Sequence, residues 1–88
     1  MKVEFRKTFE KDLRKLRDKT LLGKVKSIIE AVETANTLDE VASIKKLKGE
    51  DGYFRIRLSD YRIGLFLQDD TLRFVRILHR REFYRYFP

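Results

Sequence analysis

Hydrophobic and polar residues alternate along the second half of the chain, with the period of two that is typical of half-buried strands. The alternation predicts strands at residues 53–58, 61–67 and 72–79. Ser59 and Asp60 are expected to form a two-residue turn between the first two strands. The last strand is apolar on both faces, so we expect it to lie in the interior of a sheet.

Helical periodicity dominates the first half of the chain. A short strand is predicted at Lys2–Phe5, followed by a helix from an N-cap at Thr8 to about Lys19. Thr20 or its neighbours interrupt this helix. A second helix is predicted after the break, because apolar residues recur there at spacings of three and four: Leu21, Leu22, Val25, Ile28, Ile29 and Val32.

The remaining segments have weaker patterns. Residues Asn36–Gly52 are interpreted as a loop with one helical turn near Asp39–Ala42, and residues 80–88 as a helical turn or a tail. The predicted fold is therefore a single α+β domain over residues 1–88. Its N-terminal strand and helical hairpin are expected to pack on one face of an antiparallel sheet.

The predicted hairpin of residues 53–67 has two different faces. We expect the helices to cover the face that carries Phe54, Ile56, Leu58, Ile63, Leu65 and Leu67. The other face carries arginines, with Arg57 opposite Arg62 and Arg55 opposite Gly64. Like charges directly across a sheet are destabilising, which suggests an anionic ligand, although a solvated strand face is the alternative. Gly64 would leave space there for a ligand backbone.

The composition favours a polyanionic partner. The 88 residues include 21 Lys and Arg against 14 Asp and Glu, a net charge of +7. Nucleic acid, an acidic protein or an anionic membrane surface would suit this charge, and simple solubility would also explain it. The absence of cysteine excludes disulfides and thiolate metal sites, so we expect no metal or other cofactor. No apolar run approaches the ~20 residues of a membrane span, and a cytoplasmic protein is expected.

Four short motifs occur in a recognisable order: Leu47-Lys48-Gly49, Arg55-x-Arg57, Asp60-Tyr61-Arg62 and His79-Arg80-Arg81. Over nearly its whole length the chain resembles the RelE/ParE superfamily of toxin–antitoxin toxins. The RelE branch implies a ribosome-dependent endoribonuclease, an mRNA interferase that a cognate antitoxin wraps and inhibits. The ParE branch implies the same fold and a DNA gyrase inhibitor. A non-catalytic member that only binds its partner is a further alternative.

The resemblance also suggests site residues. It implies catalytic roles for Arg55, Arg57, Arg62, Arg81 and Tyr84, with Tyr86 a weaker candidate for the tyrosine. We expect the neighbouring cations to bind RNA: Lys45, Lys46, Lys48, Arg80 and Arg85. The best-known RelE members carry lysines where this chain has Arg55 and Arg57. Because arginine keeps its proton, the charge role carries over and a role as general base does not.

His79 is the only histidine, and its ordinary pKa near 6.5 makes it a candidate proton carrier. A packed or hydrogen-bonded histidine at a strand end is the alternative. The first helix also suggests a surface for a partner, because so small a core is not expected to bury all of Phe9, Leu13 and Leu16. We expect them to form an apolar strip for an antitoxin segment, and we expect oligomers only through that complex.

Overall fold

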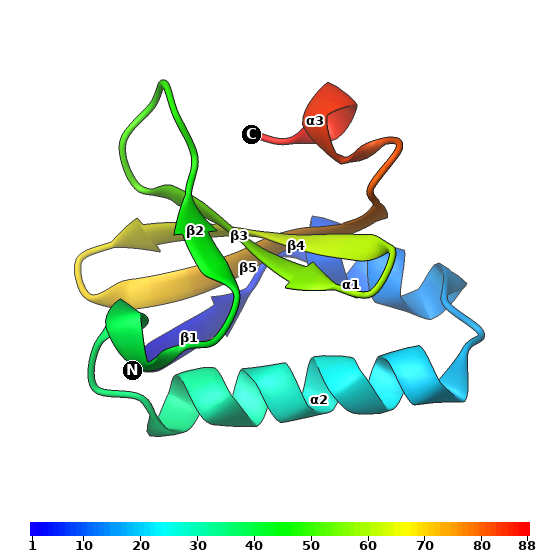
Figure 1. The fold of residues 1–88 in the computed structure, drawn as a ribbon, viewed down its shortest axis with the longest axis horizontal. Coiled ribbons are helices and arrows are strands. Elements are labelled where there is room, and N and C mark those ends of the chain that lie inside the picture. The colour runs from blue at the N-terminus through cyan, green and yellow to red at the C-terminus, as the bar shows by residue number, and fades with distance from the viewer.

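The computed structural model describes all 88 residues and has the predicted α+β fold (Figure 1). In chain order the elements are β1 (Lys2–Phe5), α1 (Lys7–Lys15), α2 (Lys19–Thr34), the 3-10 turn η1 (Leu38–Glu40), β2 (Ile44–Lys46), β3 (Tyr53–Leu58), β4 (Tyr61–Gln68), β5 (Thr71–His79) and α3 (Phe83–Tyr86). The three predicted strands of the second half are confirmed to within one residue at each end.

The sheet has five strands in the order β1-β5-β4-β3-β2. β2 to β5 are antiparallel neighbours, whereas β1 runs parallel to β5, so the sheet is mixed rather than wholly antiparallel. β5 lies in the interior, as its two apolar faces predicted. The sequence did not indicate β2, because three residues are too few to show an alternation.

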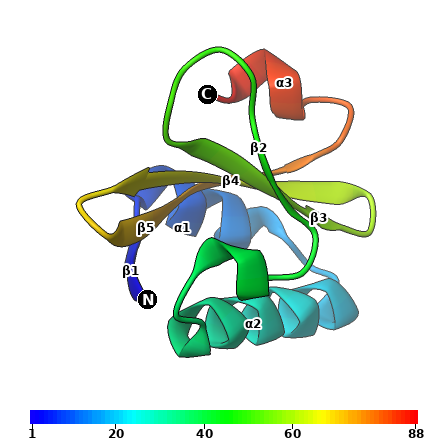
Figure 2. The ribbon, with the colours of Figure 1, turned by 60° about the vertical axis from the view of Figure 1, so that its left-hand side comes forward.

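α1 and α2 cover one face of the sheet, and α3 lies over the other (Figures 1 and 2). The core forms under α1 and α2, where Ile56, Leu58, Ile63 and Leu65 are buried and Phe54 and Leu67 pack at the margin. The predicted covered face is therefore confirmed. The predicted cross-strand pairs Arg57–Arg62 and Arg55–Gly64 are confirmed as well.

The helix boundaries differ from the prediction. α1 begins earlier, with Arg6 as its N-cap, and Thr8 lies inside the helix, where its hydroxyl donates to the carbonyl of Val75 at 2.6 Å. The helix also ends at Lys15 rather than Lys19. Asp18 caps α2 by accepting from the N–H groups of Thr20 and Leu21, so the break falls at residues 16–18.

The apolar residues of α1 are better buried than we expected. Phe9 is fully buried, with its ring centroid 5.9 Å from that of Phe5 and 5.4 Å from that of Phe74. The core has room for Phe9 because β1 enters the sheet beside β5 and extends the covered face, whereas the expectation that the core does not bury all three apolar residues of this segment is confirmed. Leu13 and Leu16 are half-buried.

The C-terminal segment (residues 80–88) covers part of the arginine-bearing face (Figure 2). Phe83 and Phe87 are buried there with Leu78 in a second, smaller apolar cluster. A Cβ on Gly64 would lie 2.8 Å from atoms of the Phe87 ring. The expectation that Gly64 leaves space for a ligand backbone was therefore wrong, because that ring already fills the space.

β5 contains a β-bulge beside α1. Gly64 pairs with Arg76 and Leu65 with Phe74, so Val75 is the extra residue. Asp12 of α1 is buried beside the bulge and accepts from Arg76 Nε at 2.8 Å, from Arg76 Nη2 at 3.1 Å and from Ile77 N–H at 3.0 Å. The hydrogen bonds that Arg76 donates to Asp12 raise the pKa of Arg76.

Candidate functional site

A groove of about 430 Å³ opens between the β2–β3 loop and α3, which rise on the same side of the sheet (Figure 1). We call it the cationic groove. Its lining consists of Lys45, Lys46, Leu47, Lys48, Arg55, Arg57, Tyr84 and Pro88. The structure therefore brings three predicted RNA-binding lysines together with three of the predicted catalytic residues.

Arg62 lies beside the groove and across the sheet from Arg57. Its pKa is lowered, first by burial and then by the positive charges of Arg57, Arg55 and Arg80, while Tyr84 acts in the opposite sense. None of the chain's four ion pairs involves the arginines of β3 and β4. The cluster is thus an uncompensated concentration of positive charge, which a bound anion would relieve.

Arg55 is the buried member of the cluster. Its residue is only 7% exposed, although it lies on the expected face, because β2 and the C-terminal segment flank it. One hydrogen bond is formed by its guanidinium, from Nη1 to the carbonyl of Ser43 at 3.3 Å. A guanidinium has five N–H donors, so Arg55 retains donors for a ligand in the groove.

Among the residues after β5, Arg80 and Tyr84 lie near the arginine cluster or the groove, and Arg81 and Arg85 belong to neither. Arg80 donates its N–H to the carbonyl of Asp60 at 2.7 Å, and its charge acts on Arg62, whereas the charge of Arg81 is not among those that shift this pKa. Tyr84 is 65% exposed and lines the groove. Arg85 is exposed on α3 and is not part of the groove lining.

Tyr86 faces away from the groove, and its ring centroid lies 5.9 Å from Cζ of Arg76. Tyr84 is therefore the tyrosine that the structure places with the arginines. Sequence reasoning missed Leu47 and Pro88 as groove residues. Nothing in the pattern indicated where the C-terminal segment would fold back.

His79 lies on the other face of the sheet from the arginine cluster. It pairs with Tyr61 in the β4–β5 register, and the two rings meet edge to face with centroids 5.4 Å apart. Its Nδ1 accepts from the N–H of Arg81 at 3.2 Å. It borders a hollow that α1 also lines, through Asp12 and Lys15. The structure therefore does not bring His79 together with Arg57 and Arg62.

No group of three or more His, Cys, Asp or Glu side chains is placed to hold a metal ion. None of the helices has the length and apolar character needed to cross a membrane.

Comparison with known proteins decides the family. Residues 3–84 match the family described as "ParE toxin of type II toxin-antitoxin system, parDE". The chain belongs to the RelE/ParE family of toxins. Among curated members of this family, Toxin RelE3 of Methanocaldococcus jannaschii is 45% identical over 89 residues, covering 100% of both chains. Putative toxin RelE1 of the same organism is 37% identical over 81 residues, covering 91% of this chain and 89% of the relative.

Solved structures agree with this family assignment. A chain of the RelB–RelE antitoxin–toxin complex from Methanococcus jannaschii superposes with a TM-score of 0.83 at 42% identity, covering 97% of this chain and 99% of that chain. A chain of the RelE–RelB complex from Pyrococcus horikoshii has a TM-score of 0.72 at 23% identity, covering 90% and 93%, which shows the shared fold alone. The α+β fold class is thereby confirmed.

Proposed function

We propose that this toxin is an mRNA endonuclease of the RelE type, which cleaves messages in the ribosome and is held inactive by a cognate antitoxin. The observation that carries the proposal is the convergence of Arg55, Arg57 and Arg62 at the cationic groove without acidic partners. The curated relatives named RelE support the choice of branch.

The groove suits phosphoryl chemistry that needs no metal. Attack of a 2′-oxygen on the adjacent phosphorus builds negative charge on a phosphorane, and preorganised cations stabilise that charge. Guanidinium groups are planar and match two phosphate oxygens at once. Arg57 and Arg62 hold the reacting phosphate in this mechanism, and Arg55 contacts it from the floor of the groove.

Tyr84 supplies the hydroxyl of the site. Its exposure over the groove allows it to hydrogen-bond the 2′-oxygen or to stack on an unstacked base. The direct role of His79 as proton carrier stays a prediction. Its Nδ1 accepts from the N–H of Arg81, and its ring lies on the face of the sheet opposite the arginine cluster.

The proposed antitoxin binds to the helical side of the molecule as well as near the groove. A hollow of about 380 Å³ between α1 and α2 is lined by Leu13, Leu22, Val25 and Ile29, with Lys26, Glu30 and Glu33 at its rim. An amphipathic segment that orders on binding would cover this strip and the half-buried residues of α1. The similar RelE chains are found in complexes with RelB antitoxins.

Inhibition of DNA gyrase is the second candidate function. The description of the matching family names ParE, and Arg55 and Arg57 keep their protons and so cannot act as general base. A gyrase inhibitor needs a protein-binding surface and no convergent phosphate site. Induction of the chain in cells separates the two functions, because cuts within translated messages indicate the nuclease and gyrase-dependent DNA breaks with intact messages indicate the inhibitor.

Alanine variants of Arg57 and Arg62 test the site itself. Each change is expected to lower single-turnover cleavage on programmed ribosomes by about 10²-fold, since each removes a charge that stabilises the phosphorane. Arg17→Ala is the matched control, because Arg17 is exposed in the link between α1 and α2, away from the groove. Normal cleavage by either groove variant would remove that residue from the proposed site.

A further inference from the structure

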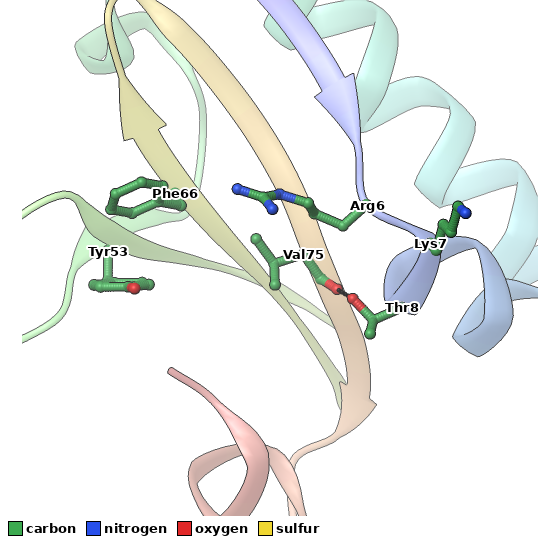
Figure 3. A pocket seen from close by; sticks show the side chains of 6 residues that line it. All are labelled: Arg6, Lys7, Thr8, Tyr53, Phe66 and Val75. Atoms are coloured by element: carbon green, nitrogen blue, oxygen red, sulfur yellow. Dashed lines mark hydrogen bonds between the residues drawn. The ribbon is translucent and has the colours of Figure 1, made fainter.

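A second hollow, of about 520 Å³, lies over the arginine-bearing face of the sheet near the start of α1 (Figure 3). Its lining comes from three parts of the chain: Arg6, Lys7 and Thr8 at the start of α1, Tyr53 and Phe66 on β3 and β4, and Val75 at the bulge of β5. The cleavage mechanism proposed above uses none of these residues. We call this hollow the aromatic hollow.

The aromatic floor of the hollow is held in place from several sides. The rings of Tyr53 and Phe66 lie with centroids 4.7 Å apart, and Phe87 meets Tyr53 edge to face at 5.6 Å. Gly52 has φ of +90°, and a Cβ there would lie 2.9 Å from the Phe66 ring. The glycine therefore makes room for that ring, and the two aromatic side chains form a preorganised surface.

Arg6 faces this floor, and Lys7 lies at the rim of the hollow with its side chain directed away from the rings. The side chain of Arg6 extends over Val75 toward Phe66 (Figure 3), and neither Arg6 nor Lys7 takes part in an ion pair. The nearby carboxylate of Glu4 is already engaged by Arg73 at 3.1 Å. The bond from Thr8 to Val75 ties the start of α1 to the sheet and so fixes the cations relative to the rings.

We propose that the aromatic hollow binds one nucleobase of single-stranded RNA. The base stacks against Tyr53 and Phe66, and its neighbouring phosphates contact Arg6 and Lys7. Aromatic platforms beside a cationic track are the means by which proteins hold single strands without a fixed sequence. The choice of RNA rather than DNA rests on the proposed function, while the stacking site itself follows from the geometry.

The position of the hollow on β3 sets the distance between the bound base and the arginine cluster. Tyr53 and Arg57 share one face of β3 four residues apart, which corresponds to about 13 Å along a strand. Stacked nucleotides advance by about 3.4 Å each, so the bound base lies about four nucleotides from the phosphate at the arginine cluster. The hollow therefore holds the message at a fixed distance from the cut and positions the strand in the groove, whatever the identity of the stacked base.

Substitution of the aromatic floor tests the stacking. Phe66→Leu keeps an apolar side chain and removes the ring, and it is expected to weaken the binding of a labelled single-stranded RNA of about 12 nucleotides by about tenfold. Its affinity for base-free polyphosphate is expected to stay unchanged. Phe5→Leu is the matched control, because Phe5 is an exposed aromatic residue outside the hollow. RNA binding by Phe66→Leu at wild-type affinity would overturn the proposal.

The cations are tested with the pair Arg6→Gln and Lys7→Gln, with Lys11→Gln as the control on the same helix. The pair is expected to weaken binding of both RNA and polyphosphate and to reduce the slope of log affinity against log salt by about 1.4. If RNA and polyphosphate respond alike to every variant, Phe66→Leu included, the hollow is only an electrostatic surface and the proposal is wrong. Displacement of RNA by an acidic peptide, together with unchanged RNA affinity in Phe66→Leu, would identify a peptide site and also overturn it.

The failure of this proposal is distinguishable from failure of the proposed function. The RNA titrations are performed on the chain that also carries Arg57→Ala and Arg62→Ala, so they do not depend on cleavage. A loss of RNA affinity in Phe66→Leu supports the stacking site even if no message is cut in cells. Cleavage of messages in cells with no effect of Phe66→Leu on RNA binding rejects the stacking site and leaves the nuclease standing.

Discussion

At the scale of single residues, the pair Arg57 and Arg62 places like charges directly across two strands. The lowered pKa of Arg62 means that the folded state binds its proton more weakly than the unfolded state does. This destabilisation is present at every pH below the lowered pKa of the folded state. The destabilisation is therefore fully present at neutral pH. Removal of a neighbouring charge, screening by salt or binding of an anion relieves the part that comes from charge repulsion.

Arg57→Gln is accordingly expected to raise the free energy of unfolding by about 0.5 kcal/mol at low salt. The gain should shrink in concentrated salt, because the exposed charge is screened. Urea denaturation at two salt concentrations measures it, with Arg17→Gln as the control for loss of an arginine elsewhere. A loss of stability in Arg57→Gln at low salt would contradict the view that the cluster is strained by its own charge.

Asp12 presents the opposite case, a charge whose partners are all in place. Asp12→Asn is expected to cost about 3–5 kcal/mol, because it leaves Arg76 unpaired beside a buried group. Glu4→Gln breaks the exposed pair with Arg73 and should cost less than about 1 kcal/mol. Urea denaturation measures the free energy of unfolding of both variants. Equal losses would show that the Asp12–Arg76 pair does not owe its larger contribution to burial.

At the scale of elements, the contact between the Phe87 ring and Gly64 is one of those that hold the C-terminal segment on the sheet. Gly64→Ala is expected to cost about 1–3 kcal/mol, since its methyl group overlaps the Phe87 ring. The cost should disappear in a chain that already carries Phe87→Ala. Gly23→Ala in α2 is the control, because a Cβ there meets nothing within 4 Å, and it should stabilise the helix by about 1 kcal/mol.

Thermal or urea unfolding of the four chains in this cycle supplies the coupling energy. Hydrogen exchange of residues 80–88 shows whether the loss is confined to the segment. If Gly64→Ala is equally costly with and without Phe87, the steric account of this contact is wrong.

The sequence predicted elements best where a pattern repeated several times. Three strands followed from hydrophobic patterns over six or more residues, and the register between β3 and β4 followed from their alternation. β2 has three residues and no alternation to detect. The limits of α1 were misjudged because Thr8 resembles an N-cap in sequence, whereas its hydroxyl serves the bulge of β5. Only tertiary contact determines that choice.

At the scale of the whole molecule, the sequence and its family resemblance named most of the residues that line the cationic groove. Alternation along the hairpin placed Arg55, Arg57 and Arg62 on one face, and the structure confirms this placement. The contributions of Tyr84 and Pro88 depend on how the C-terminal segment folds back, for which there is no local signal. His79 was grouped with the arginines because it is the only histidine, and so the natural proton carrier, and is followed in sequence by two arginines. The strand register places its side chain on the other face.

The parallel pairing of β1 with β5 has a consequence for synthesis of the chain. Residues 2–5 pair with residues 71–74, so the first strand to be synthesised can pair only after the last strand has been synthesised. A nascent chain that stops before Thr71 lacks an interior strand of the sheet and leaves Phe9 without Phe74. Contacts so distant in sequence close slowly and late. A message interrupted before the codon for Thr71 therefore yields a peptide without β5, which cannot complete the sheet or bury Phe9 against Phe74.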